Sequence, residues 1–189
     1  IVNPIGCATC HNTKTMKLEV HQPALVEAFE RQGKDINNAT HQEMRSLVCA
    51  QCHVEYYFKG DKKHLTFPWD KGMTIEKMEE YYDAEGWTDY VHPLSRTPIL
   101  KAQHPDYELS QLGIHGQRGV SCADCHMPYK TDGAVKFSDH HISSPLRNVS
   151  ASCQTCHRQS EEELVKNVYD RQDAVYRMRM KLEKQLAKV

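Results

Sequence analysis

The chain has 189 residues, of which 39% are hydrophobic, and its formal net charge at pH 7 is -1. This length suits one domain, and the nearly neutral charge argues against nucleic acid as a partner. The sequence contains no uninterrupted apolar run of roughly 18 residues, so it predicts no transmembrane segment.

The first half of the chain predicts three helices separated by polar loops. Each begins at a helix-start signal: a proline in the first turn, a Thr capping box with Glu at its third position, or a Thr N-cap. The helices are expected over 23–32, 40–48 and 74–82. Between the last two, residues 59–72 are expected to form a polar loop.

The second half has weaker signals as far as residue 159. Residues 91–106 contain three prolines and are expected to be irregular. A turn or two of helix is expected at 107–112, and a hairpin or loop at 129–139. Strand signals are nearly absent elsewhere, so the chain is expected to be mainly helical.

The end of the chain predicts one long helix. Ser160 with Glu163 forms a capping box, and no helix breaker follows it. Apolar residues repeat at heptad spacing from Val168 to Val189, which predicts a helix over 160–189 that packs against another helix.

A Cys-x-x-Cys-His box occurs four times and uses all eight cysteines. The two thiols of such a box can attach to one haem, and the adjacent histidine can bind its iron. Each box therefore predicts two attachment cysteines and one proximal histidine. The boxes are Cys7, Cys10 and His11; Cys49, Cys52 and His53; Cys122, Cys125 and His126; and Cys153, Cys156 and His157.

Zinc and disulfides are the competing interpretations of these cysteines. Zinc sites also use Cys-x-x-Cys pairs, usually two pairs close enough to share one metal, and they require no histidine after each pair. Here the pairs lie far apart and His follows every one. We therefore favour haem c at four sites, and its apolar porphyrins would account for the low mean hydropathy of -0.70.

The predicted fold is a mainly α multihaem c-type cytochrome, with helices and long loops wrapped around closely packed haems. Haem attachment of this kind takes place outside the cytoplasm, so a periplasmic protein is expected. We expect one domain over 1–189, truncated at both ends, with haem-binding residues at 1–158 and the start of the long helix at 160–189. No signal peptide is visible, which is typical of a mature, trimmed or partial chain.

Three stretches resemble pentahaem cytochrome c nitrite reductase, the ammonia-forming enzyme. The second box continues as Val-Glu-Tyr-Tyr-Phe up to Phe58, residues 101–105 read Lys-Ala-Gln-His-Pro, and the third box is followed by Met127 and Pro128. The order and approximate spacing of the last four haems of that family cover essentially the whole chain.

The resemblance implies an active site and a calcium site. Tyr56 and His104 would be active-site residues over the catalytic haem. The calcium ion would be bound by Glu55, by the carbonyls of Tyr56 and Lys101, and by the side chain of Gln103. All four donors are oxygens, which suits this hard cation.

The resemblance also implies two distal haem ligands. His140 would be the distal ligand of the haem in the first box, and His141 is a neighbour that could be confused with it. His115 would be the distal ligand of the haem in the fourth box. The distal ligands of the second and third haems would lie outside this chain.

Two features of the family have no counterpart here. Its catalytic haem uses a Cys-x-x-Cys-Lys box, and its active site includes an arginine; both lie upstream of the first haem seen in this chain. We therefore expect a fragment that covers the last four haem sites, with a fifth haem upstream.

The resemblance implies reduction of nitrite to ammonium by a homodimer, with other small nitrogen oxides or hydroxylamine as further substrates. Electrons would come from a quinol-oxidising membrane cytochrome or from a soluble multihaem donor. Two alternatives stay open. A non-catalytic tetrahaem electron carrier would have only bis-His haems in the complete protein, and a relative of the hydroxylamine-oxidising multihaem enzymes would carry a tyrosine cross-linked to a haem.

Overall fold

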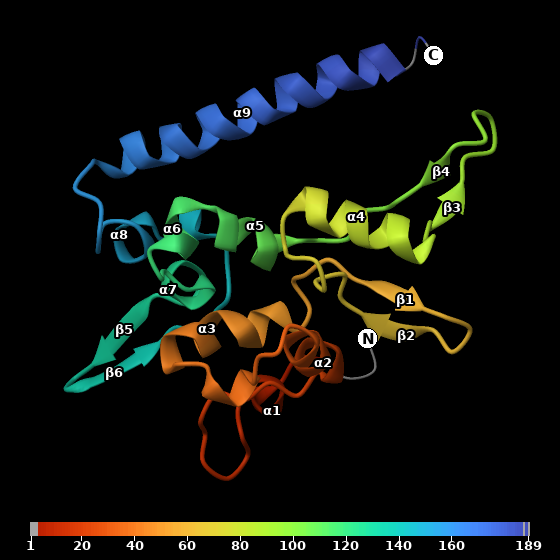
Figure 1. The fold of residues 1–189 in the computed structure, drawn as a ribbon. Helices are drawn as coiled ribbons and strands as arrows, with labels where there is room; N and C mark the ends of the chain where they lie inside the picture. Colours follow the sequence, from red (N-terminus) through yellow and green to blue (C-terminus); the bar gives the residue numbers. More distant parts are fainter. Residues whose placement is uncertain (1–3, 187, 189) are drawn as a thin grey trace. The chain divides into compact units, whose positions relative to one another are not determined.

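The structure is a computed structural model that describes residues 4–186 and 188 (Figure 1). It divides into two compact units, Ile1–Cys122 and Ala123–Val189. Helices predominate over three short two-stranded sheets in the described residues, which confirms the mainly α prediction. The single domain over 1–189 stays a prediction. None of the helices within residues 4–186 has the length and apolar character needed to cross a bilayer.

The first unit contains most of the short helices and two of the hairpins. Its helical elements are α1 (Cys7–Cys10), α2 (Pro23–Arg31), η1 (Ile36–Asn38), α3 (His41–Ala50), α4 (Ile75–Glu85), α5 (Asp106–Leu112), α6 (Ile114–Gln117) and the start of α7 (Cys122–His126). Its strands form two antiparallel pairs, β1 (Tyr57–Lys59) with β2 (His64–Thr66) and β3 (Tyr90–Val91) with β4 (Pro98–Ile99).

The helix boundaries follow the capping signals. Before α3, the Thr40 hydroxyl accepts a hydrogen bond from the Glu43 amide at 3.2 Å, and Glu43 Oε2 accepts one from the Thr40 amide at 2.7 Å. This reciprocal pair is the predicted capping box. Helix α4 begins after Thr74 and ends at Gly86, whose φ of 62° is the left-handed conformation that glycine adopts without steric cost.

The polar loop expected at 59–72 is wrong in two respects. Residues 64–66 pair with 57–59 as a hairpin, which three-residue strands are too short to signal by alternation. Phe67 and Trp69 follow the hairpin and are fully buried at 0% exposure. The region expected to be irregular likewise contains the two-residue pairing of β3 with β4.

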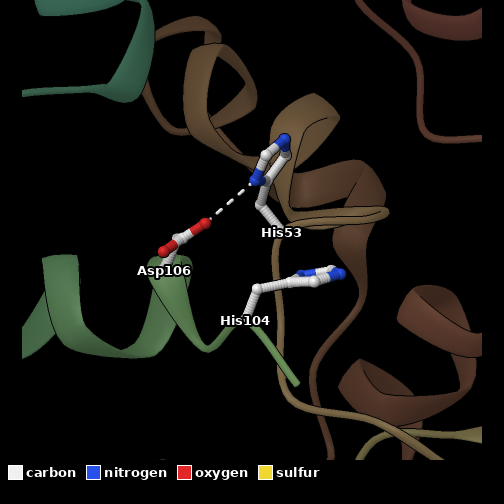
Figure 2. A group of neighbouring side chains, drawn as sticks. All are labelled: His53, His104 and Asp106. Atoms are coloured by element: carbon white, nitrogen blue, oxygen red, sulfur yellow. Dashed lines mark hydrogen bonds and ion pairs between the residues drawn. The ribbon is translucent and has the colours of Figure 1, made fainter. Parts of the chain in front are cut away.

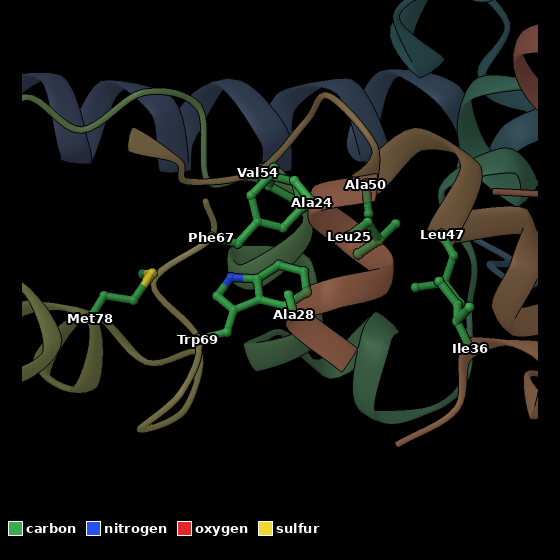
Figure 3. Packing of buried hydrophobic residues seen from close by; sticks show 10 residues of the cluster. All are labelled: Ala24, Leu25, Ala28, Ile36, Leu47, Ala50, Val54, Phe67, Trp69 and Met78. Carbon is green, nitrogen blue, oxygen red and sulfur yellow. The ribbon is translucent and has the colours of Figure 1, made fainter. Parts of the chain in front are cut away.

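The hydrophobic core of the first unit brings α2, α3 and the Phe67 segment together (Figure 3). Leu25 and Ala28 on α2 meet Leu47 and Ala50 on α3, and Trp69 lies beside Phe29 and Phe67 in the same cluster. The apolar residues of α2 and α3 repeat at helical spacing, so each helix buries one face. This core fixes the end of α3, where the second haem box begins.

The second unit is built from the remainder of α7, one hairpin, two short helical turns and one long helix. The elements after α7 are β5 (Tyr129–Asp132), β6 (Val135–Ser138), η2 (Pro145–Arg147), α8 (Val149–Ser152) and α9 (Glu161–Leu186). The pairing of β5 with β6 confirms the hairpin alternative for 129–139. Helix α9 confirms the long C-terminal helix, although Val189 lies outside the described residues.

Helix α9 buries none of its described residues. Several large apolar side chains on it are more than half exposed: Val175, Met178, Leu182 and Leu186. An apolar stripe of this kind on a long helix is typical of a surface that packs against another helix.

Candidate active site

The second Cys-x-x-Cys-His box is held at the end of α3. Cys49 lies in the last turn of the helix, and the amides of Cys52 and His53 donate hydrogen bonds to its carbonyl at 3.1 and 3.0 Å. The thiols therefore project from a tight turn with the histidine directly after it.

Thiols from the first three boxes interact within the first unit: those of Cys10, Cys49, Cys52 and Cys122. A hydrogen bond to the Cys122 thiol, together with burial, raises the pKa of Cys49, and the charges of Cys10 and Cys52 act in the same direction. All eight cysteines lie among the described residues, and none of them forms a disulfide. At least one thiol from each of these three boxes thus lies close to Cys49.

The proximal histidines are oriented through their Nδ1 atoms in three of the boxes. Nδ1 of His11 lies 2.8 Å from the Met16 carbonyl, and Nδ1 of His126 lies 3.0 Å from the Ser143 carbonyl. Nδ1 of His53 lies 2.9 Å from a carboxylate oxygen of Asp106. Because Nδ1 is engaged, these rings would bind iron through Nε2, so the boxes fit haem c.

The two motifs that carry the resemblance meet at Glu55. The backbone amide of Gln103 donates a hydrogen bond to Glu55 Oε2 at 2.7 Å, and the Tyr82 hydroxyl donates one to Oε1 at 3.0 Å. Glu55 is buried, and desolvation raises the pKa of its carboxyl group. A buried carboxylate is costly without compensating charge, so this position suits a bound cation.

Three aromatic rings lie next to one another where residues 53–56 meet residues 103–108, a region that we call the junction. The centroid of the His104 ring is 5.7 Å from that of Tyr56 and 5.7 Å from that of His53. Figure 2 shows His104 entering from the segment before α5 and lying beside His53. The structure thus brings the two predicted active-site side chains together next to a haem box.

Helix α5 connects this junction to the core. Its fully buried Glu108 accepts hydrogen bonds from the Glu55 amide at 2.9 Å and from Trp69 Nε1 at 2.7 Å. The Tyr107 amide donates to the His53 carbonyl at 3.0 Å. The backbone of residues 53–55 is therefore held from one side by α5.

Two of the residues expected to bind calcium adjoin Glu55. Tyr56 follows it directly, and Gln103 reaches it through the backbone amide. The Lys101 amide donates a hydrogen bond to Asp89 Oδ2 at 2.7 Å, so a second carboxylate lies close to the expected donors. An oxygen-rich site with two carboxylates fits the preferences of calcium.

The two expected distal ligands stay predictions. His115 belongs to the first unit and the fourth box to the second, whereas His140 belongs to the second unit and the first box to the first. Nδ1 of His140 lies 2.9 Å from the Ser138 carbonyl, and Nδ1 of His141 lies 2.8 Å from Asp139 Oδ1. The two neighbouring histidines are therefore oriented by different partners.

A groove of about 720 Å³ lies elsewhere in the first unit, between α3 and the segment of α5 and α6. Its lining includes no cysteine or histidine. It therefore holds none of the predicted haem or active-site groups, and the junction at Glu55 is the better candidate.

Four residues of the junction were missed by sequence analysis: Tyr82, Asp89, Asp106 and Glu108. Asp106 and Glu108 come directly after the Lys-Ala-Gln-His-Pro motif, which was the available signal. Tyr82 and Asp89 gave none, because their partners lie far away in the sequence.

Comparison with known proteins agrees with these features. The sequence model of the cytochrome c552 family matches residues 1–189. Cytochrome c-552 of Bacteroides thetaiotaomicron is 71% identical over 188 residues, which are 100% of this chain and 38% of the relative. Cytochrome c-552 of Maridesulfovibrio salexigens is 56% identical over 174 residues, which are 86% of this chain and 35% of the relative.

A solved structure of a cytochrome c nitrite reductase is also similar to this chain. Cytochrome c nitrite reductase from Desulfovibrio desulfuricans, described with two calcium sites in its catalytic subunit, superposes with a TM-score of 0.83 at 40% identity. The match covers 90% of this chain and 39% of that one. The chain spans somewhat more than a third of its relatives' length, and its resemblance to cytochrome c nitrite reductase is confirmed. The chain belongs to the cytochrome c552 family.

Proposed function

We propose that this chain is the part of a periplasmic, ammonia-forming cytochrome c nitrite reductase that holds four electron-relay haems and one side of the nitrite pocket. The observation that carries the proposal is the meeting of Tyr56, His104 and Glu55 at the second haem box. The solved nitrite reductase that superposes on the chain supports the same reaction class.

His104 and Tyr56 have separate roles in the proposed reaction. Haem c, when bound, would relay the electrons that reduce nitrite. In this proposal His104 donates a hydrogen bond or a proton to an oxygen of nitrite, and Tyr56 donates another from its hydroxyl. Both act on the oxygen atoms that leave as water, where positive charge stabilises the developing negative charge.

Calcium is the second cofactor of the proposal. It would be bound by the Glu55 carboxylate, the carbonyls of Tyr56 and Lys101, and the Gln103 side chain. The cation offsets the cost of a buried Glu55 carboxylate and raises the local positive potential, which attracts an anionic substrate.

Four histidines would be proximal iron ligands, with His115 and His140 as distal ligands in the relay haems of the fourth and first boxes. Two filled axial positions make a haem an electron carrier. The electrons would come from a quinol-oxidising membrane cytochrome or from a soluble multihaem donor.

The experiment is the intact mass and haem stoichiometry of the full-length protein, with peptide mapping of the attachment cysteines. The proposal expects five haems, four of them on the boxes of this chain. A protein with four haems, all low-spin, would instead be a tetrahaem electron carrier.

The proposed homodimer uses the exposed apolar stripe of α9. Replacing Val175 and Met178 together by Glu is expected to give a monomer in analytical ultracentrifugation. Lys184→Glu, half a turn away from Val175 in helical projection, is the control and is expected to stay dimeric. A dimer that survives the double substitution would exclude this surface.

A further inference from the structure

His53 differs from the other oriented proximal histidines in the group that its Nδ1 contacts. His11 and His126 face backbone carbonyls, of Met16 and Ser143 respectively. Nδ1 of His53 instead donates to Oδ2 of Asp106 at 2.9 Å, which is the dashed contact in Figure 2. One haem box thus pairs its histidine with a negatively charged group, whereas two pair it with neutral dipoles.

This difference has an electronic consequence for a bound iron. A carboxylate is a stronger hydrogen-bond acceptor than an amide carbonyl and draws the Nδ1 proton toward itself. The ring then becomes a more basic ligand at Nε2, which stabilises ferric over ferrous iron. A partner of this kind also fixes the tautomer and the plane of the ring.

The position of Asp106 is set by its own helix. Asp106 is the first residue of α5, and its amide donates to the His104 carbonyl at 2.7 Å. The next amide, of Tyr107, donates to the His53 carbonyl at 3.0 Å. The Tyr107 contact therefore joins the first turn of α5 to the box, next to the side-chain contact of Asp106.

We propose that Asp106 is a positioning residue that orients His53 and lowers the reduction potential of the haem attached at Cys49 and Cys52. The inference rests on the haem attachment proposed above. Its effect is expected at that haem because the Asp106 carboxylate contacts His53, whereas the Nδ1 atoms of His11 and His126 have carbonyl partners.

The same residues allow a competing interpretation. Ligand atoms of His53, His104 and Asp106 all lie within 4.8 Å of one another, so the three could hold a separate metal ion. In that case His53 would ligate this ion rather than haem iron. Substitution of Asp106 would then release the metal ion without changing the reduction potential of any haem.

The test compares full-length haem-loaded protein with its Asp106→Asn variant, which keeps the size and removes the charge. Spectroelectrochemical titration and electron paramagnetic resonance follow the haems, and elemental analysis follows other metals. We expect the ratio of reduced to oxidised haem at fixed potential to rise about tenfold at one site, equal to about 59 mV for a one-electron couple. The low-spin signal of that haem is expected to shift, with the others unchanged.

Two further variants complete the comparison. Asp106→Glu keeps the carboxylate and is expected to restore most of the original potential. Asp83→Asn removes the same charge from an exposed position on α4 and is expected to leave every potential unchanged. If the Asn variant does not assemble, Asp106→Ser against Asp106→Glu makes the same comparison of neutral and charged partners.

Unchanged haem potentials in the Asn variant would overturn the proposal, and so would an equal shift in Asp83→Asn. Loss of a stoichiometric non-haem metal in the Asn variant would favour the separate metal site and also overturn it. Peptide mapping separates a failure of the haem proposal from a failure of the Asp106 proposal. A wild-type peptide with no haem on Cys49 and Cys52 refutes haem attachment at this box. Unchanged potentials with that haem present refute only the role of Asp106.

Discussion

The backbone amide of Gln103 donates a 2.7 Å hydrogen bond to Oε2 of Glu55. This contact joins the segment after the second haem box to the Lys-Ala-Gln-His-Pro segment. It places a buried carboxylate next to Tyr56 and His104, and the proposed reaction depends on this arrangement.

Replacing Glu55 by Gln is expected to weaken calcium binding at least about tenfold, because the site loses a charged oxygen ligand. Isothermal titration calorimetry on chelator-treated full-length protein measures the affinity. Glu27→Gln is the matched control, since Glu27 is paired with the exposed His64 at 2.8 Å and lies on α2. Equal calcium affinity in the wild type and the Glu55 variant would place the ion elsewhere.

Replacing Tyr56 by Phe is expected to lower kcat for nitrite by about 100-fold, because the pocket loses a proton or hydrogen-bond donor. Steady-state kinetics with a reduced dye as donor measures this loss. The control is Tyr57→Phe: the Tyr57 hydroxyl contacts the Tyr81 hydroxyl at 2.8 Å in a buried aromatic cluster. That variant is expected to lose about 1 kcal/mol of stability and to keep its activity. Similar kinetics for both variants would remove Tyr56 from the mechanism.

Glu108 is expected to make the stability of the protein depend on pH. Burial raises its carboxyl pKa, and no described residue offers a hydrogen bond to its buried Oε2. A raised pKa in the folded state means that the native form binds the proton more tightly than the unfolded chain. This stabilisation is present below the ordinary pKa of about 4.3 and is lost as the pH rises through the folded pKa.

The Glu108→Gln variant cannot titrate at this position. Between about pH 4 and pH 7, its unfolding midpoint is therefore expected to fall less steeply with rising pH than that of the wild type, in calcium-free buffer. Chemical denaturation at several pH values measures the slope. Exposed Glu79 on α4 provides the control variant Glu79→Gln. Parallel curves for the wild type and Glu108→Gln would contradict the raised pKa.

Gly116 is required by the close approach of α6 to α5. A Cβ atom there would lie 2.2 Å from the Ser110 carbonyl oxygen, so Gly116→Ala must displace backbone. Because His115 is the adjacent residue, we expect loss of one bis-His haem signal in the low-spin spectrum and a lower unfolding midpoint. Gly113→Ala is the control, since its added Cβ would meet Ser110 at an ordinary 3.4 Å. An unchanged spectrum for Gly116→Ala would argue against His115 as a ligand.

Local signals predicted much of the fold. Thr40 with Glu43, and Thr74 with Gly86, marked helix boundaries because capping depends on residues a few positions apart. The β1–β2 hairpin was missed because its strands have only three residues each, and the burial of Trp69 depends on distant partners.

As with the fold, part of the candidate site was predicted from the sequence. The boxes and the two motifs identified His53, Tyr56 and His104, which the structure brings together. Glu108 was missed because an acidic residue in a polar sequence ordinarily indicates solvent exposure. Asp106 is exposed, and it was missed because its partner His53 lies 53 residues away in the sequence. Their contacts with His53 and Glu55 arise only when α5 packs against the second box.

The most direct test of the central claim is the product of nitrite turnover by the full-length, haem-loaded protein. With a reduced dye as the electron source, we predict one ammonium per nitrite and consumption of six electrons, with loss of activity in the Tyr56 and His104 variants. Haems that accept and donate electrons while nitrite stays unchanged would contradict the claim and would identify the protein as an electron carrier.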